Sequence, residues 1–277
     1  MKTRIISAMV GLVILAVVLI FFDTLLLNAV VAFISLIAVH ELLKATGITR
    51  HPALTAVGIS LAAAIPMAQL GVFQRFLPVV FLFVISLFLI LFRQHALITI
   101  QQVAMTFFFS MIIPLFFVCI VFFRDHYGPQ QGLFYVLISL CAAWLCDSGA
   151  YFVGRAFGKH KLAPQISPKK TIEGSVGGAL VATLLVFPVS LGFQWGMAKL
   201  GYNVTVNFLA LGITFPLFCI AGMVGDLSLS VIKRQFNVKD YGKIMPGHGG
   251  ILDRFDSVLF VLPLVYTVCG YWPLVSM

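Results

Sequence analysis

Aspartates stand beside lysine, arginine and glycine in three segments of a chain of which only 10% is charged. Asp226 is followed by Ser230 and Lys233 on one helix face, and Asp253 and Asp256 lie three residues apart at a predicted helix start. Carboxylates without paired Cys or His suit a hard cation such as Mg²⁺, which also takes phosphate oxygens. Lysine and arginine suit the phosphates themselves. The three segments therefore predict a site for a magnesium nucleotide or a phosphorylated lipid.

The first of these segments, residues 144–178, contains Asp147 near its start. Tyr151 and Arg155 follow it at i+4 and i+8, so the three side chains share one helix face. A carboxylate inside a membrane helix costs roughly 2.5 kcal/mol or more and marks a functional site by default. The alternative is an internal tether between Asp147 and Arg155 that reaches the membrane surface.

The same segment contains a lysine-rich loop, residues 158–171, in which two prolines prevent a helix. Thr171 can cap the next helix, and the glycines that follow leave one face of that helix bare for a close neighbour. A lysine cluster alone is also explained by membrane topology or by contact with anionic lipid. Beside Asp147, the loop is interpreted as binding nucleotide or lipid phosphate. The predicted substrate contacts in this segment are Asp147, Tyr151, Arg155, Ser167, Lys169 and Lys170.

The third segment, residues 233–257, holds eight of the 27 charged residues. Its sequence PGHGG, residues 246–250, predicts a turn that can bring backbone N–H groups of Gly249 and Gly250 against a ligand. His248 either hydrogen-bonds a phosphate or a metal-bound water, or only stabilises the turn. The predicted phosphate contacts here are Lys233, Arg234, Lys239, Lys243 and Arg254.

The composition that surrounds these segments is that of an integral membrane protein. The chain is 61% hydrophobic, with a mean hydropathy of +1.08. Its apolar runs approach the roughly 20 residues that cross a bilayer as helix, and no period-2 barrel pattern is visible. We predict an all-α helical bundle, one membrane domain over residues 1–277, with an N-terminal scaffold (1–130) and catalytic motifs (144–257). The nine predicted spans are 5–22, 25–41, 53–71, 77–92, 102–123, 131–153, 173–195, 206–231 and 255–272.

The positive charges predict an orientation. With nine spans and a cytoplasmic N-terminus, all 18 lysines and arginines except Arg75, Arg124 and Lys199 lie on the cytoplasmic side. This asymmetry favours N-terminus in and C-terminus out, with the candidate site at the cytoplasmic face. Part of it can also reflect substrate binding, because the two richest loops belong to the candidate site.

The motifs also resemble a known family. The pattern S-x-x-K-R-x4-K-D-x-G-x3-P-x-H-G-G-x-x-D-R-x-D, from Ser230 to Asp256, is similar to the signature of phosphatidate cytidylyltransferases. The upstream patterns D-S-G-A-Y-F-x-G-R-x-F-G-K and S-P-K-K-T-x-E-G resemble the same family. Met245 and Ile172 depart from its usual residues, and both departures keep an apolar side chain.

The resemblance implies transfer of CMP from CTP to phosphatidic acid in a lipid bilayer, giving CDP-diacylglycerol and pyrophosphate. It implies Mg²⁺ with a second cation such as K⁺, a homodimer, a bacterial inner membrane and no nucleic-acid partner. The implied metal ligands are Asp226, Asp253 and Asp256, with Asp147 nearby.

Three alternatives remain open at this stage. A related CTP-dependent enzyme acting on an archaeal ether lipid or a polyprenol would share the metal and nucleotide groups. An ion-coupled transporter would also carry intramembrane aspartates, although transporters usually place their sites near the midplane between internal repeats. An inactive relative would keep the fold as a scaffold.

Overall fold

The computed structural model describes residues 9, 11, 13, 16–67, 73–244 and 249–277. The protein is 79% helical, which confirms an all-α membrane protein in broad terms. The helices are α2 (Leu25–Ala45), α3 (Pro52–Met67), α4 (Phe73–Arg93), α5 (Ile100–Phe117), α6 (Cys119–Phe157), α7 (Ile172–Lys199), α8 (Phe208–Gln235) and α9 (Leu252–Tyr271), with a 3₁₀ turn at Ile48–Arg50.

Each predicted span from the second onward coincides with a helix, while most of the first, 5–22, lies outside the described residues. Within the described residues, four helical stretches are long and apolar enough to cross a membrane, and two shorter apolar helices accompany them. The number nine therefore stays a prediction. The predicted break at 124–130 is confirmed, because Gly128, just before Pro129, has the non-helical backbone angles φ +79° and ψ +164° and separates two helical parts of α6. A further interruption at Val118, between α5 and α6, was not predicted.

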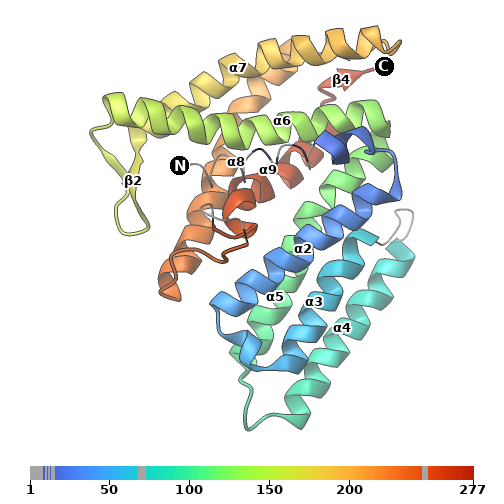
Figure 1. Cartoon of the computed structure of the whole chain (residues 1–277), viewed down its shortest axis with the longest axis vertical. Coiled ribbons are helices and arrows are strands. Elements are labelled where there is room, and N and C mark those ends of the chain that lie inside the picture. The colour runs from blue at the N-terminus through green and yellow to red at the C-terminus, as the bar shows by residue number, and fades with distance from the viewer. Residues whose placement is uncertain (1–8, 10, 12, 14–15, 68–72, 245–248) are drawn as a thin grey trace. The chain divides into compact units, whose positions relative to one another are not determined.

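The chain folds into two compact units, Met1–Val121 with Phe236–Arg254, and Phe122–Gln235 with Phe255–Met277. In the first unit α2, α3, α4 and α5 pack side by side as long helices (Figure 1). Side chains cap two of these helices: Thr24 accepts the N–H of Leu26 at α2, and Thr99 and Gln102 form a capping box at α5. The single membrane domain stays a prediction.

The second unit is built on helices whose backbones touch. A Cβ at Gly178 of α7 would lie 2.6 Å from the backbone nitrogen of Ala150 and 2.7 Å from the carbonyl oxygen of Cys146, both on α6. A Cβ at Gly174 would lie 2.8 Å from the carbonyl oxygen of Ala150. The bare face predicted for residues 174–178 is therefore used to bring α6 and α7 together, as small residues do between membrane helices.

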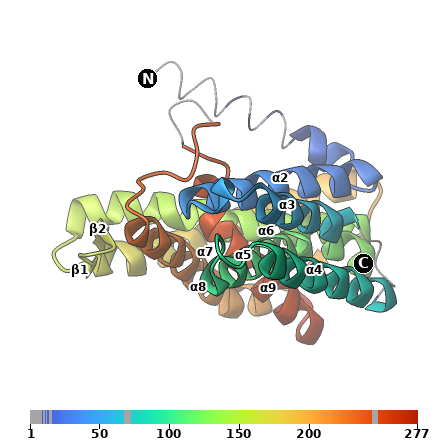
Figure 2. The ribbon, with the colours of Figure 1, turned by 90° about the horizontal axis from the view of Figure 1, so that it is seen from below.

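Two short antiparallel pairs of strands interrupt the all-α pattern. β1 (Lys161–Ala163) pairs with β2 (Ser167–Thr171), and β3 (Thr205–Val206) pairs with β4 (Val275–Ser276). Figure 2 shows the β1–β2 hairpin beyond the end of α6. The two prolines of residues 158–171 thus exclude a helix as predicted, but the segment is a hairpin rather than an irregular loop.

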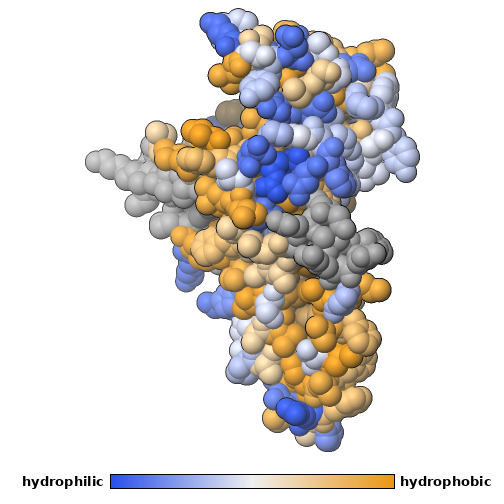
Figure 3. Space-filling model, turned by 90° about the vertical axis from the view of Figure 1, so that its right-hand side faces the viewer, coloured by the Kyte–Doolittle hydropathy of each residue, from blue (hydrophilic) through white to orange (hydrophobic). Residues whose placement is uncertain are grey.

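Hydrophobic side chains cover broad areas of the surface, with hydrophilic residues gathered in patches (Figure 3). On α7 the exposed apolar residues recur at helical spacing, at Leu180, Leu184 and Leu191. On α4 the same holds for Phe81 and Phe92, which are 61% and 70% exposed. Rows of this kind are expected where a helix faces lipid rather than water.

Candidate active site

Three helices of the second unit each supply one carboxylate: Asp147 from α6, Asp226 from α8 and Asp256 from α9. Ser257 joins two of them, since its hydroxyl donates to Oδ2 of Asp147 at 3.0 Å and its backbone N–H donates to Oδ1 of Asp256 at 2.8 Å. Asp147 is half-buried, and Asp256 is buried. These contacts orient both carboxylates through one residue at the start of α9.

A glycine brings the third carboxylate close. A Cβ at Gly225 would lie 2.5 Å from the carbonyl oxygen of Asp256 and 3.0 Å from the ring of Phe260, so α8 and α9 meet along their backbones. The next residue, Asp226, is within hydrogen-bonding reach of Asp256. Ser230, one turn later on the predicted face, donates to Oδ1 of Asp226 at 3.3 Å. The two negatively charged side chains of Asp226 and Asp256 therefore lie close together, and a nearby positive charge is needed to offset their repulsion.

Lys170 of β2 supplies such a cation by forming an ion pair with Asp226. Burial lowers the pKa of Lys170, but the charges of Asp226, Asp147 and Asp256 outweigh burial and raise the pKa overall. The ammonium group therefore stays protonated among the three carboxylates. Lys233 also acts electrostatically on Asp226 and Asp256.

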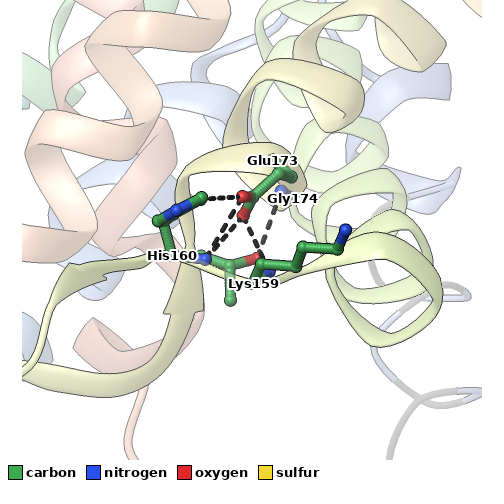
Figure 4. Close-up of polar contacts among 5 residues, drawn as sticks. Lys159, His160, Glu173 and Gly174 are labelled. Atoms are coloured by element: carbon green, nitrogen blue, oxygen red, sulfur yellow. Dashed lines mark hydrogen bonds and ion pairs between the residues drawn. The ribbon is translucent and has the colours of Figure 1, made fainter.

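The base of the hairpin is fastened by Glu173, the second residue of α7. Its carboxylate accepts the backbone N–H groups of Lys159 and His160 at 3.1 Å and contacts Nδ1 of His160 at 2.6 Å (Figure 4). Thr171 caps α7 as predicted, accepting the N–H of Gly174 at 3.1 Å. These contacts hold residues 159 and 160 against the start of α7, which directly follows the strand that carries Lys170.

The other predicted site residues of this unit have different surroundings from the three carboxylates. Arg234 donates through Nε to the carbonyl oxygen of Ile166 at 3.1 Å, so it supports the tip of the hairpin. Ser167 is half-buried and Lys169 is exposed, although both belong to β2. The exposed residues of the predicted Asp147 face are Tyr151, which is 61% exposed, and Arg155.

In the first unit Asp253 contacts two described parts of the signature loop, residues 239–253. Oδ2 of Asp253 accepts the N–H of Tyr241 at 2.8 Å and that of Gly250 at 3.0 Å. In this structure a neighbouring carboxylate accepts the N–H of Gly250, and the contact of this N–H with a ligand stays a prediction. Gly249, with φ +90°, occupies the left-handed conformation that favours glycine.

The remaining predicted residues of this loop reach the surface or fall outside the description. The exposed ones are Lys239, Lys243 and Arg254. His248 lies outside the described residues. Glu41 of α2 is not among the predicted site residues, and its carboxylate accepts the N–H groups of Ile251 and Leu252. A carboxylate at the end of an apolar span was the available signal, but nothing in the sequence indicated its partners.

The donor chemistry of the second unit fits a hard cation. Asp147, Asp226 and Asp256 offer only oxygen ligands, and the ammonium group of Lys170 already lies among them as a positive charge. In the part of the chain that the structure describes, however, no group of three or more His, Cys, Asp or Glu side chains is arranged to hold a metal ion. The metal set that includes Asp253 stays a prediction.

Comparison with known proteins identifies the family. The model of the cytidylyltransferase family matches residues 2–272. The chain belongs to the cytidylyltransferase family. This confirms the resemblance that the motifs of residues 144–257 carry.

Individual members of the family align over part of the chain. A phosphatidate cytidylyltransferase of Staphylococcus haemolyticus is 49% identical over 149 residues, which is 54% of this chain and 54% of that protein. A Bacillus subtilis protein of the same name is 45% identical over 137 residues, 50% of this chain and 48% of that protein. The chain spans about half the length of the curated relatives it matches.

Proposed function

We propose that this chain is a phosphatidate cytidylyltransferase, which transfers CMP from CTP to phosphatidic acid and releases pyrophosphate. The observation that carries the proposal is the convergence of three helix-borne carboxylates on a lysine of the β1–β2 hairpin. A triphosphate requires cations at its oxygens, and carboxylates hold such cations in phosphoryl-transfer sites. The aligned relatives are named phosphatidate cytidylyltransferase, which supports CTP and phosphatidic acid as the substrates.

The chemistry follows from charge. The phosphate of phosphatidic acid is already anionic near neutral pH, so its attacking oxygen needs no general base. This oxygen bonds to the α-phosphorus of CTP while the bond from that phosphorus to the oxygen bridging the β-phosphate breaks, and pyrophosphate leaves with the electron pair. Reactions of this type are accelerated mainly by positioning and by neutralisation of charge.

Each part of the site has a role in this proposal. Lys170 and Lys233 bind phosphate oxygens, and Arg234 holds the hairpin that carries Lys170. By the motif resemblance, Asp226 and Asp256, with Asp147 nearby, would hold Mg²⁺ together with phosphate oxygens, and the ion would neutralise charge on the triphosphate. Ser257 orients Asp147 and Asp256. Asp253 remains a predicted metal ligand because of its place in the sequence motif.

Several finer features belong to the same proposal. We propose nine membrane spans, a cytoplasmic N-terminus, an outer C-terminus and a site at the cytoplasmic face of a bacterial inner membrane. The charge asymmetry of lysine and arginine supports this orientation. Mg²⁺ with a second cation such as K⁺, and a homodimer, follow from the motif resemblance.

The test is product analysis with purified protein in lipid vesicles. Radiolabelled CTP is offered with phosphatidic acid, dolichol or unsaturated archaetidic acid in parallel reactions. The proposal predicts labelled CDP-diacylglycerol from phosphatidic acid and much slower labelling of the other two lipids. Preferential labelling of dolichol or archaetidic acid would assign the related activity instead, and no labelled lipid from any acceptor would refute the transferase reaction.

A further inference from the structure

We propose that Glu41 is a positioning residue that holds the signature loop in the conformation that orients Asp253. The role of Asp253 in metal binding rests on the proposed function, whereas the contacts of Glu41 do not. Glu41 belongs to α2, some 210 residues before the loop, and none of the sequence motifs includes it. The proposal concerns the first unit alone.

The carboxylate of Glu41 caps the start of α9. Its Oε1 accepts the N–H of Ile251 at 3.1 Å, and its Oε2 accepts the N–H of Leu252, the first residue of α9, at 2.9 Å. The N–H groups of a first helical turn have no partner within the helix, and a carboxylate satisfies them best. Glu41 is only 3% exposed, so water does not compete for these contacts.

The loop backbone lies directly against this carboxylate. A Cβ at Gly242 would stand 2.7 Å from Cδ of Glu41, and a Cβ at Gly250 would stand 2.6 Å from the same atom. Neither glycine has a positive φ, so the backbone itself would accept alanine. The buried carboxylate of Glu41 therefore leaves no room for a Cβ at residue 242 or 250 unless this carboxylate shifts.

Glu41 and Asp253 accept the backbone N–H groups of the same turn, residues 250–252. Asp253 takes the N–H of Gly250, and Glu41 takes the next two, those of Ile251 and Leu252. Any shift of this turn therefore moves the carboxylate of Asp253. The two carboxylates also repel each other, with Lys44 as a compensating charge. Stability alone does not favour two like charges on one turn, whereas a site that must fix a carboxylate does.

The first test follows hydrogen exchange of the full-length, metal-free protein by mass spectrometry. Glu41→Gln keeps the shape but replaces one acceptor by an NH₂ group that cannot accept, so the amides of residues 250–252 should exchange about tenfold faster. The control is Asn28→Ala, which removes another buried hydrogen bond of α2, from Nδ2 to the carbonyl oxygen of Pro66 at 2.8 Å. Unchanged exchange in Glu41→Gln, or equal acceleration in Asn28→Ala, would overturn the proposal.

A reciprocal test changes Gly242, one of the two glycines that lie against Glu41. Gly242→Ala should lower the melting temperature clearly in the wild-type background, because the new methyl group collides with Glu41. In a Glu41→Ala background the same change should have little further effect, since the colliding atoms are gone. Equal losses in the two backgrounds would show that Glu41 does not press on the loop, and would contradict the proposal even if Glu41→Gln folds poorly.

The link to Asp253 is tested by titrating Mg²⁺ alone and following the melting temperature without substrate. The half-saturating Mg²⁺ concentration should rise about tenfold in Glu41→Gln and stay unchanged in Asn28→Ala. A merely structural role would lower the melting temperature at every Mg²⁺ concentration without moving the midpoint, which would overturn the positioning role. Because no turnover is measured, this result is independent of whether the proposed transfer occurs.

Discussion

Removing the charge of Lys170 should lower the free energy of unfolding more than removing the charge of its neighbour Lys169. Lys170→Met leaves Asp226 without its ion-pair partner and leaves three carboxylates near one another. Breaking a fully buried pair costs about 3–5 kcal/mol, and surface pairs contribute about 0–1 kcal/mol. The side chains of Lys170 and Asp226 are 22% and 21% exposed. We therefore expect a loss of stability between the two ranges and nearer the buried one, about 2–3 kcal/mol.

The assay is equilibrium unfolding of the metal-free protein in detergent micelles, arranged as a double-mutant cycle. Lys169→Met is the matched control, because Lys169 is the exposed residue before Lys170 in the same strand. We expect the control to change the free energy of unfolding by less than about 0.5 kcal/mol. Lys170→Met and Asp226→Asn should show an interaction energy of about 1 kcal/mol or more. Additive losses for these two variants would refute the ion pair as the centre of the cluster.

Two further predictions concern the elements that carry the site. Gly178→Ala should destabilise the protein by about 2 kcal/mol or more in thermal unfolding, because its Cβ would meet the α6 backbone. Gly192→Ala on the same helix has no atom within 4 Å of its new Cβ and should be neutral or gain up to about 1 kcal/mol; equal losses would contradict the close contact. Glu173→Gln should speed tryptic cleavage within residues 158–171 several-fold by loosening the hairpin base, and an unchanged cleavage rate would contradict that role.

Much of the helical architecture is predictable from the sequence, because membrane helices need long apolar runs. The predicted span 173–195 falls within α7, and the predicted span 206–231 begins two residues before α8 and otherwise lies within it. The boundary between α5 and α6 was not predictable in this way. Apolar residues continue through Val118, so hydropathy does not mark the interruption there, whereas the polar residues of 124–130 mark the break that lies at Gly128.

The candidate site was predictable in its members more than in its contacts. Asp226 and Lys170 were both predicted as site residues, but the sequence does not say which lysine of the loop pairs with which aspartate. That choice depends on β2, which turns Lys170 inward and leaves Lys169 exposed. The contacts of Glu41 were not predictable, because its partners lie some 210 residues away and hydrogen-bond through backbone atoms.

The most direct test of the central claim is Mg²⁺-dependent pyrophosphate release from CTP on addition of phosphatidic acid. Asp256→Asn is compared with Asp125→Asn, which alters a carboxylate paired with Arg124 outside the candidate site. We expect the rate to fall on the order of 10²-fold in Asp256→Asn, as for loss of one electrostatic group in an active site, and to stay within about twofold in Asp125→Asn. Equal rates in wild type and Asp256→Asn would contradict a transfer site built on these carboxylates.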